Sequence, residues 1–226
     1  MKITIIIPAF NEETSIFEVV KTIKKAGYEK VIVIDDGSGD LTAETAKKAG
    51  AITYKHAINC GVGAALNTGF SAPEALNSDI IVTFDADGQH HAQDIEKIIA
   101  PIKTAEADVV IGSRFLDKIK KKSIPKIRIF YNKIANFISF LLSGIRLTDS
   151  QSGFRAFSSH ALEKIKISTA GYDFLTDMNR EIGIKKLRVK EVPISVTYSE
   201  YSLKKGQNFS TGIETFAKLI IKSLLR

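Results

Sequence analysis

The 226-residue sequence lacks most of the features that would cross-link a protein or anchor it in a membrane. It has one cysteine, Cys60, which excludes a disulfide framework and is typical of a protein in a reducing compartment. No apolar run approaches the ~20 residues needed to span a bilayer. The apolar stretch at residues 3–9 is too short for a signal peptide and is not followed by a small-residue cleavage site. We therefore expect a cytoplasmic protein that does not cross the membrane.

Enough apolar residues are present for a sizeable core. Hydrophobic residues make up 44% of the chain, so wholesale disorder is not expected. No linker, repeat or low-complexity segment divides the sequence. We expect a single domain over residues 1–226, in which residues 1–112 and 113–226 form two halves with different roles.

Charge is distributed unevenly between these halves. Residues 1–112 carry 10 basic and 16 acidic side chains, whereas residues 113–226 carry 22 and 9, and the whole chain has a net charge of +7. The segment from Lys118 to Arg146 holds eight basic residues and no acidic one. This asymmetry indicates an anionic partner for the second half, and nucleic acid, anionic lipid and a phosphorylated substrate all qualify. The alternative is a solvated lysine face.

The first half alternates Ile/Val-rich runs with helical patterns. The runs predict strands within residues 2–10, 30–38, 51–57, 79–87 and 108–115. Helical patterns occupy residues 14–26, 41–50, 92–103 and a stretch from about residue 61. This alternation predicts an α/β fold with a mostly parallel sheet covered by helices on both faces.

The second half is less regular. Apolar residues recur at helical spacing over residues 127–145, residues 187–198 have the pattern of a late strand, and residues 212–226 form a second amphipathic helical pattern. The helix over residues 127–145 either lies in a membrane interface or packs on the open face of the sheet.

Polar residues follow four of the predicted strands. They are Asn11 and Glu12, Asp35 and Asp36, Asp85 and Asp87, and Arg114. Because ligands of such sheets bind beyond the carboxyl ends of the strands, we expect a binding site at this edge.

The Asp85-Ala86-Asp87 motif is a candidate metal site. Residues two apart in a strand point to the same side, so the two carboxylates can bind one hard cation such as Mg²⁺. Gln89 and His91 lie close enough in sequence to add ligands or hydrogen bonds. The alternative is a solvent-exposed acidic turn.

Two further motifs suit a nucleotide. Asp36 can accept hydrogen bonds from a ribose or a base, while Ser38 or Asp40 caps the helix that follows. Gly61 and Gly63 allow close approach of a ligand at a helix start that favours anions, although tight packing of helix on sheet explains them equally well.

A last motif, DSQSGFRAF, begins at Asp149. Its Arg155 either contacts a phosphate or pairs with Asp149, and for Arg114 we favour a phosphate role. The four histidines show no metal-ligand spacing, and we interpret Cys60 and His160 as structural.

Together these motifs resemble glycosyltransferase family 2, whose members have the GT-A fold. In order they are IIIPAFNEE, VIVIDDGSGD, NCGVGAALNTG, FDADGQH, IGSRF, DSQSGFRAF and EVPI, covering residues 3 to about 200. Within the family the sequence looks most like the dolichol-phosphate mannosyltransferases and related polyprenyl-phosphate glycosyltransferases. It lacks the Ser-Lys of their terminal Gly-x-Ser-Lys segment, and many relatives continue into transmembrane helices. The Gln-x-x-Arg-Trp motif of processive synthases is absent, so polymer synthesis is not expected.

The resemblance implies an inverting transfer of a sugar from a nucleotide-sugar donor, of the GDP-mannose or UDP-glucose type, to a polyprenyl or dolichyl phosphate. It assigns the nucleoside to Pro8, Ala9, Glu12 and Asp36, with Gly63 a further donor contact from its place in the glycine-rich motif. It assigns Mg²⁺ or Mn²⁺ to Asp85, Asp87 and Gln89. It assigns the donor and acceptor phosphates to Arg114 and Arg128. On this interpretation residues 1–112 bind the donor, and residues 113–226 face the acceptor and an anionic membrane surface, with no nucleic acid partner.

Acceptor chemistry separates two alternatives within the family. A hydroxyl acceptor has a pKa near ~15.7 and needs a base, for which Asp149 is the main candidate and Asp177 a weaker one. A phosphate monoester, with a second pKa of ~6, is already an anion and needs only cations to position it. Because the second half is rich in cations, we expect a polyprenyl phosphate acceptor and peripheral association with the cytoplasmic face of the membrane.

Three other functions are weaker. A phosphohydrolase would place its Asp-x-Asp-Gly after the first strand, whereas DADG here follows the fourth. A nucleotidyltransferase of similar fold would need a glycine-rich arginine loop at the N-terminus. A membrane-surface module with an inert transferase site would not need the acidic clusters.

Overall fold

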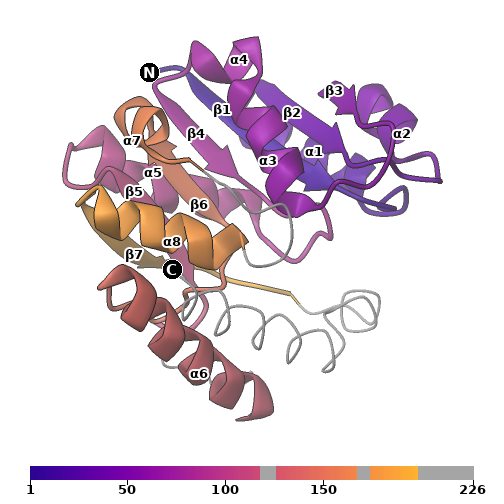
Figure 1. The fold of residues 1–226 in the computed structure, drawn as a ribbon. Coiled ribbons are helices and arrows are strands. Elements are labelled where there is room, and N and C mark those ends of the chain that lie inside the picture. The colour runs from indigo at the N-terminus through magenta and orange to yellow at the C-terminus, as the bar shows by residue number, and fades with distance from the viewer. Residues whose placement is uncertain (118–125, 167–173, 198–226) are drawn as a thin grey trace.

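The structure is a computed structural model that describes residues 1–117, 126–166 and 174–197, apart from the side chains of Lys126 and Arg128. Its centre is a seven-stranded sheet in the order β3-β2-β1-β4-β6-β5-β7 (Figure 1). The strands are β1 (Ile3–Ala9), β2 (Lys30–Asp35), β3 (Ile52–Lys55), β4 (Ile80–Thr83), β5 (Val109–Ser113), β6 (Arg155–Ser158) and β7 (Val189–Pro193). The helix predicted over residues 212–226 and residues 118–125 of the basic segment lie outside the described residues.

The sheet is mostly parallel, as the Ile/Val-rich runs predict. Strands β1 to β4 pair in parallel, and β7 extends the sheet parallel to β5. Strand β6 was not predicted, and it runs antiparallel between β4 and β5. Its four residues are too few to show an alternation, and its first residue is a buried arginine, which gives no strand signal in a sequence.

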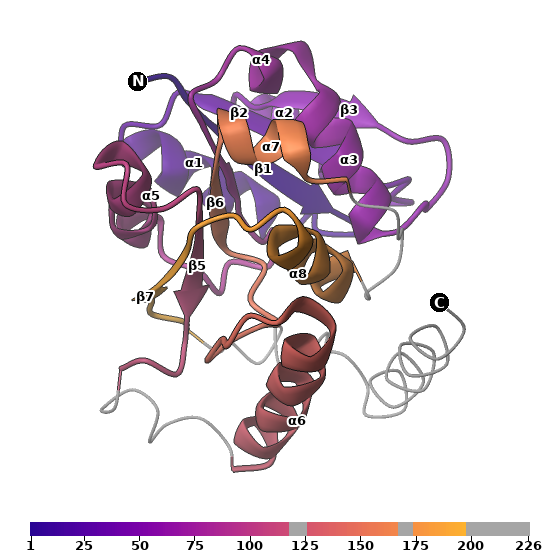
Figure 2. The ribbon, with the colours of Figure 1, turned by 60° about the vertical axis from the view of Figure 1, so that its left-hand side comes forward.

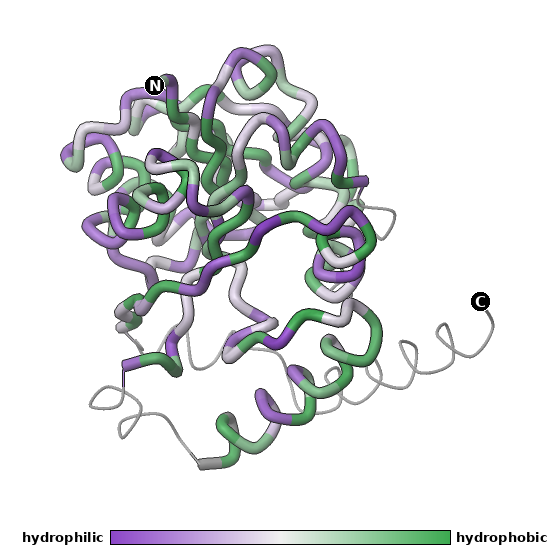
Figure 3. The backbone as a smooth tube through the Cα atoms, turned by 90° about the vertical axis from the view of Figure 1, so that its left-hand side faces the viewer, coloured by the Kyte–Doolittle hydropathy of each residue, from purple (hydrophilic) through white to green (hydrophobic). Residues whose placement is uncertain are grey.

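Helices cover both faces of the sheet, which explains why the strands are apolar at consecutive positions. One face packs against α1 (Ile16–Lys25), α2 (Thr42–Lys48) and α5 (Ile95–Lys103), the last preceded by the short turn η1 (Ala92–Asp94). The other face packs against α3 (Val62–Ser71), α4 (Pro73–Leu76), α7 (Ser159–Lys164) and α8 (Phe174–Ile184). Figure 3 shows the hydrophobic strands enclosed between these two layers.

The predicted amphipathic helix is present as α6 (Lys126–Ser143), and it packs against α8 (Figure 2). The two helices approach so closely that a Cβ atom on Gly183 would lie 1.9 Å from the carbonyl oxygen of Ser143. The opposite side of α6 is apolar and exposed: Ile127, Phe130, Phe137 and Leu141. In the described part of the chain no helix is both long enough and apolar enough to cross a membrane.

Candidate active site

The carboxyl ends of the parallel strands meet at one edge of the sheet, and the predicted polar clusters lie there. Strand β1 leads to Glu12, β2 to Asp36, β4 to Asp85 and β5 to Arg114. Because β6 is antiparallel, it starts at this same edge, and the loop before it brings in Asp149. The fold therefore collects along a single edge the residues predicted to bind the donor, called the donor side below, and those predicted to bind the acceptor, called the acceptor side.

The Asp85–Asp87 motif lies beyond β4, not within it. The strand ends at Thr83, and the chain turns at Gly88, which has a φ of +74°. The strand alternation that was expected to align the two carboxylates therefore does not extend to them, and each has its own partner. His90 Nε2 lies 2.9 Å from Asp85 Oδ2, while Asp87 accepts hydrogen bonds from the backbone N–H and the side-chain amide of Gln89, at 3.0 and 2.5 Å.

The histidine that contacts this motif is His90, and the prediction of His91 was wrong. His91 points away and contacts the hydroxyl of Thr197 at 2.9 Å. The side chain of His90 is only 5% exposed and packs edge-on against Phe84 and at a tilt against Phe154. Its Nδ1 atom has no hydrogen-bond partner among the described residues, so the imidazole makes its one polar contact with Asp85. His90 thus fixes the orientation of that carboxylate.

The two aspartates have opposite electrostatic environments. Partial burial raises the pKa of the Asp85 carboxyl, but the hydrogen bond and charge of His90, with the charge of Arg114, outweigh it and hold that pKa below its usual range. Burial, followed by the charge of Asp85, raises the pKa of Asp87 against the hydrogen bonds of Gln89. The turn therefore carries more negative charge than its protein partners neutralise.

This turn fits a hard divalent cation. It offers two carboxylates, one of them destabilised by its neighbour's charge, and a nearby amide oxygen on Gln89, which are the ligand types that Mg²⁺ and Mn²⁺ prefer. In the structure the amide nitrogen of Gln89 faces Asp87, so Gln89 ligates an ion only after its amide rotates.

The loop before β6 presses against Asp85. The Thr83 hydroxyl donates to the Gly153 carbonyl at 2.6 Å, and a Cβ atom on Gly153 would lie 2.7 Å from Asp85 Oδ1. Only a glycine at this position leaves the Asp85 carboxylate where it is.

Arg114 and Asp149 form a bidentate ion pair at the acceptor side of the edge. Arg114 Nε and Nη2 each lie 2.7 Å from an oxygen of Asp149, and the Arg114 backbone N–H donates to Oδ2 at 3.1 Å. Asp149 is fully buried, while the Arg114 side chain is 24% exposed. Glu191 holds the loop by accepting the backbone N–H groups of Thr148 and Asp149. Arg114 thus donates hydrogen bonds to both carboxylate oxygens of Asp149, while Glu191 fixes the backbone on which Asp149 stands.

The predicted roles of Arg155 are both wrong. Arg155 is fully buried, so it does not contact a phosphate, and the ion pair of Asp149 is with Arg114. Its guanidinium donates to the carbonyls of Ser152 and Ser150 and to Asn179 Oδ1, at 2.8, 2.8 and 2.7 Å. Burial lowers the pKa of Arg155 to about 10, against the opposing charges of Asp149 and Glu191. Arg155 is thus the internal support of the loop.

Asn179 is the partner that the sequence did not reveal. From α8 it accepts from Arg155 and donates to Ser139 of α6 and to the Ser150 carbonyl, at 3.0 and 3.2 Å. Arg128, the other predicted phosphate ligand, lies in the first turn of α6, but its side chain is outside the described set.

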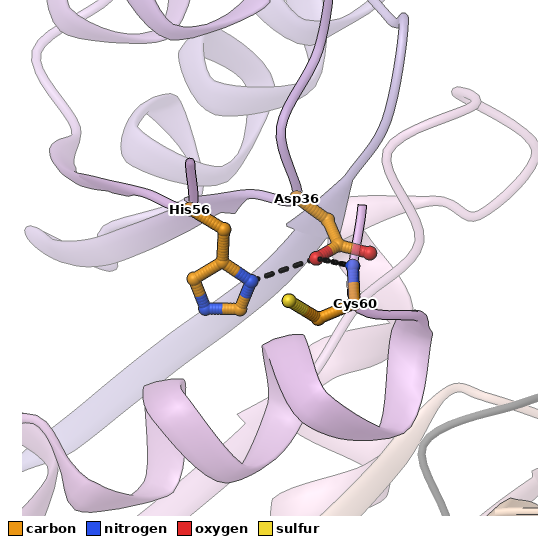
Figure 4. A group of neighbouring side chains, drawn as sticks. All are labelled: Asp36, His56 and Cys60. Atoms are coloured by element: carbon orange, nitrogen blue, oxygen red, sulfur yellow. Dashed lines mark hydrogen bonds and ion pairs between the residues drawn. The ribbon is translucent and has the colours of Figure 1, made fainter. Parts of the chain in front are cut away.

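On the donor side, Asp36 lies at the end of β2 and is almost fully buried. Its Oδ1 accepts from the backbone N–H of Cys60 at 2.9 Å and its Oδ2 from that of Gly61 at 2.7 Å. His56 Nδ1 lies 2.7 Å from Oδ1, and the Cys60 thiol is close by (Figure 4). Sequence spacing does not reveal this cluster, because 20 and 24 residues separate His56 and Cys60 from Asp36.

The remaining predicted donor residues lie on β1, in the loop after it and on α3. Pro8 and Ala9 end β1, where Ala9 pairs with Asp35 of β2, and Gly63 is buried in the first turn of α3. Glu12 is buried, and its Oε2 accepts from Ser15 at 2.6 Å. All four therefore lie in the elements that meet at this end of the edge.

Comparison with known proteins agrees with this architecture. The chain matches the family described as glycosyl transferase family 2 over residues 4–166. It is 43% identical to an uncharacterized protein of Methanocaldococcus jannaschii over 99% of this chain and 93% of that one. It is 38% identical to the UDP-N-acetylglucosamine–dolichyl-phosphate N-acetylglucosaminyltransferase of Methanococcus voltae, over 97% of this chain and 95% of that one.

A solved structure shares the fold. The glucosyl-3-phosphoglycerate synthase of Mycobacterium tuberculosis, crystallised with Mn²⁺, uridine diphosphate and glucosyl-3-phosphoglycerate, superposes with a TM-score of 0.71 at 20% identity. The match covers 97% of this chain and 78% of that one. The chain therefore belongs to glycosyltransferase family 2, has the GT-A fold, and is a hexosyltransferase with relatives that act on dolichyl or polyprenyl phosphates.

Proposed function

We propose that this enzyme transfers a hexose from a nucleoside diphosphate sugar, of the GDP-mannose or UDP-glucose type, to a polyprenyl or dolichyl phosphate. In the reaction an oxygen of the lipid phosphate forms a bond to the anomeric carbon while the bond from that carbon to the nucleoside diphosphate breaks, with inversion. The Methanococcus voltae relative, named for transfer to dolichyl phosphate, supports this class of acceptor.

The donor diphosphate belongs at the Asp85–Asp87 turn in this proposal. Asp85, Asp87 and Gln89 would hold Mg²⁺ or Mn²⁺ there, and such an ion, when bound, neutralises charge on the leaving diphosphate. His90 orients Asp85 from a buried position, so the carboxylate needs little reorganisation to bind. Arg114 is near enough for its charge to lower the pKa of Asp85, which supports a place for Arg114 beside the same diphosphate.

The nucleoside belongs between the ends of β1 and β2. The loops that follow these strands are fastened to each other: the Asn11 N–H donates to Ser38 Oγ at 2.9 Å, and the Glu12 N–H donates to Thr42 Oγ1 at 2.8 Å. A surface pre-organised in this way loses little conformational entropy on binding a base and ribose. We assign the nucleoside contacts to Pro8, Ala9, Glu12, Asp36 and Gly63.

The burial and hydrogen bonding of Asp149 are the observation that most supports a phosphate acceptor over a hydroxyl acceptor. A hydroxyl acceptor needs a base that its proton can reach, within hydrogen-bond distance. Asp149 is fully buried, both of its oxygens accept from Arg114, and its loop is fastened by Glu191. Asp149 therefore positions the cationic side chain of Arg114. An acceptor that is already an anion needs such cations to bind it and needs no base.

A membrane-bound acceptor also requires the enzyme to reach a membrane surface, and we assign this to the segment from Lys118 to Arg146. The described part of it combines the exposed apolar side of α6 with Lys133 and Arg146. Each basic residue near an anionic surface contributes ~1 kcal/mol, which favours peripheral binding at the cytoplasmic face. Binding to vesicles is expected to increase with the fraction of anionic lipid and to decrease with salt concentration. Binding that depends on neither would contradict a membrane-binding role for this segment.

Nucleotide titration tests the donor half of the proposal. Uridine diphosphate and guanosine diphosphate are titrated into the full chain with and without Mn²⁺, by calorimetry. We expect one of the two to bind, and binding to weaken when Mn²⁺ is withdrawn. An absence of metal-dependent binding of either nucleotide would contradict the proposal and favour an inert module.

A further inference from the structure

Asp36, His56 and Cys60 come together from three separate elements at the donor end of the edge (Figure 4). Asp36 follows β2, His56 follows β3, and Cys60 precedes α3. One ligand atom from each lies within 4.8 Å of the other two. Within the described ranges this is the one group of three histidine, cysteine, aspartate or glutamate side chains close enough to share an ion.

The histidine is held in the way that metal-binding histidines are held. His56 Nε2 lies 2.9 Å from the hydroxyl of Thr68 in α3, while Nδ1 faces Asp36 at 2.7 Å. A hydroxyl can donate or accept, so Thr68 supports either tautomer of the ring. When Nε2–H donates to Thr68, Nδ1 presents its lone pair to an ion beside Asp36. A partner on the second ring nitrogen is the usual arrangement around a bound metal.

An ion fits between these groups with a small movement. Tetrahedral bonds of about 2.0 Å to nitrogen and oxygen separate the two ligand atoms by roughly 3.3 Å, only slightly more than the present 2.7 Å between His56 and Asp36. The ion would replace the proton that these two atoms now share. Asp36 keeps the hydrogen bonds from the N–H groups of Cys60 and Gly61, which hold the carboxylate in place.

The donor set selects a different metal from the Asp85–Asp87 turn. One thiolate, one imidazole and one carboxylate suit Zn²⁺, whereas carboxylate and amide oxygens suit Mg²⁺ or Mn²⁺. Three protein ligands leave a fourth position for water. Cys60 is exposed, so an ion can reach the site from solvent and the thiol proton can leave to solvent on binding.

We propose that Asp36, His56 and Cys60 form a second metal site, specific for Zn²⁺ and similar thiophilic ions, that competes with the sugar donor. The competition rests on the proposed function, in which Asp36 contacts the nucleoside. An ion on Asp36 removes that contact and adds a positive charge and a water molecule where the nucleoside would lie. Zn²⁺ then inhibits by raising the apparent Kd of the donor nucleotide.

Cobalt reports the site directly, because Cys60 is the sole cysteine of the chain. Co²⁺ is titrated into the full-length protein and the near-ultraviolet spectrum is recorded. We expect a thiolate-to-cobalt charge-transfer band that Zn²⁺ abolishes. Cys60→Ser should remove the band, and His56→Gln should weaken Zn²⁺ binding at least ~10-fold, as should Thr68→Val, which removes only the outer partner. Asp87→Asn, at the oxygen site, should leave the band unchanged.

The opposite results overturn the site. No charge-transfer band in the wild type, or Zn²⁺ affinity unchanged in both Cys60→Ser and His56→Gln, would show that these residues do not bind the ion. Unfolding curves for each variant distinguish a lost ligand from a lost fold, and Cys60→Ser is the safest variant because the side chain is exposed.

A second arm tests the competition. The Kd of the nucleotide that binds in the presence of Mg²⁺ is measured at increasing Zn²⁺ concentrations. We expect it to rise with Zn²⁺ in the wild type and to stay constant in Cys60→Ser, which also controls for Zn²⁺ at the Asp85–Asp87 turn. A cobalt band with no effect of Zn²⁺ on nucleotide affinity would reject the competition. If neither nucleotide binds while the cobalt band persists, the proposed function fails and the metal site stands.

Discussion

The donor side and the acceptor side of the sheet edge that forms the candidate site are held in place in different ways. On the donor side the loops at residues 11–13 and 38–42 exchange several hydrogen bonds between backbone N–H groups and side-chain oxygens, many of them exposed or half-buried. On the acceptor side one buried guanidinium, that of Arg155, binds the carbonyls of Ser150 and Ser152 and the amide of Asn179. The donor loops thus share their support among many contacts, most of them near solvent, whereas the acceptor loop, which Glu191 holds at residues 148 and 149, takes several buried contacts at residues 150–152 from the single side chain of Arg155.

This difference has a physical consequence. Losing one contact near solvent lets water replace it, so the cost of a single change on the donor side is small. Losing Arg155 takes the hydrogen bond away from the buried Ser152 carbonyl and from Asn179 Oδ1, and each then costs its desolvation, while the Ser150 carbonyl keeps the hydrogen bond from Asn179. We therefore expect structural damage to be greatest on the acceptor side, whereas the greatest chemical damage follows from the charged turn that lies between the two sides.

The largest effect is expected for Asp87→Ala in that turn. The change removes a carboxylate that we assign to the metal and the donor diphosphate, and losing electrostatic stabilisation of this kind costs at least ~10²-fold in rate. Sugar transfer and metal-dependent nucleotide binding are measured together. Asp79→Ala is the control, because Asp79 binds the backbone N–H of Lys2 at the opposite end of β4. If Asp87→Ala turned over at nearly the wild-type rate, Asp87 would not be a ligand of a catalytic metal ion.

Arg155→Met tests the concentrated support of the acceptor loop. We expect the free energy of unfolding to fall by about 2–4 kcal/mol, since two buried acceptors lose their hydrogen bond and the Ser150 carbonyl keeps only that of Asn179. Urea unfolding measures it. Ser38→Ala is the donor-side counterpart, because it removes the acceptor of only the Asn11 N–H, and it should cost ~1 kcal/mol. Equal losses in the two variants would refute the contrast between the two sides.

Gly153→Ala probes the contact between the acceptor loop and the metal turn. The added methyl group would lie 2.7 Å from Asp85 Oδ1, so the carboxylate has to shift. We expect the metal concentration at half-maximal activity to rise about tenfold, in line with the effect of disturbing the support of a metal ligand. Ser152→Ala is the matched control, since the Ser152 hydroxyl makes no hydrogen bond to the part of the chain that the structure describes, and its carbonyl is what binds Arg155. Identical metal dependence in the two variants would contradict the contact.

The smallest effect is expected for Arg188→Met, a surface arginine that contrasts with Arg155. Arg188 holds the pKa of Asp108 below its usual range, first by hydrogen bonding to its carboxyl. A depressed pKa in the folded state stabilises the protein above the unfolded value of ~3.9, and this contribution is lost as the pH falls through the folded value. The variant should therefore be slightly less stable at neutral pH, and the difference should vanish in acid. A difference that persists below the folded pKa would mean that packing, not charge, is responsible.

The same contrast explains what could be predicted from the sequence. The Ile/Val-rich runs predicted five of the seven strands and the pattern over residues 187–198 a sixth, and the residues after the first-half strands predicted the edge where the candidate site lies, because these signals are local. Strand β6 and the partners of Arg114, Asp149 and Arg155 depend on contacts between segments distant in sequence, such as Arg155 with Asn179. The choice of His91 over His90 failed for a related reason, since β4 ends at Thr83 and the turn after it sets which side chain faces Asp85.

The most direct test of the central claim is the choice of acceptor. Transfer of radiolabelled sugar is measured to polyprenyl phosphate, to the dephosphorylated polyprenol and to a free sugar, with the wild type and with Asp149→Asn. We expect transfer to the phosphate alone. Asp149→Asn should lower it several-fold by loosening Arg114, far short of the ~10²–10⁴-fold loss that follows removal of a general base. Transfer to the polyprenol or the sugar but not to the phosphate, abolished by Asp149→Asn, would contradict the account and identify Asp149 as the base.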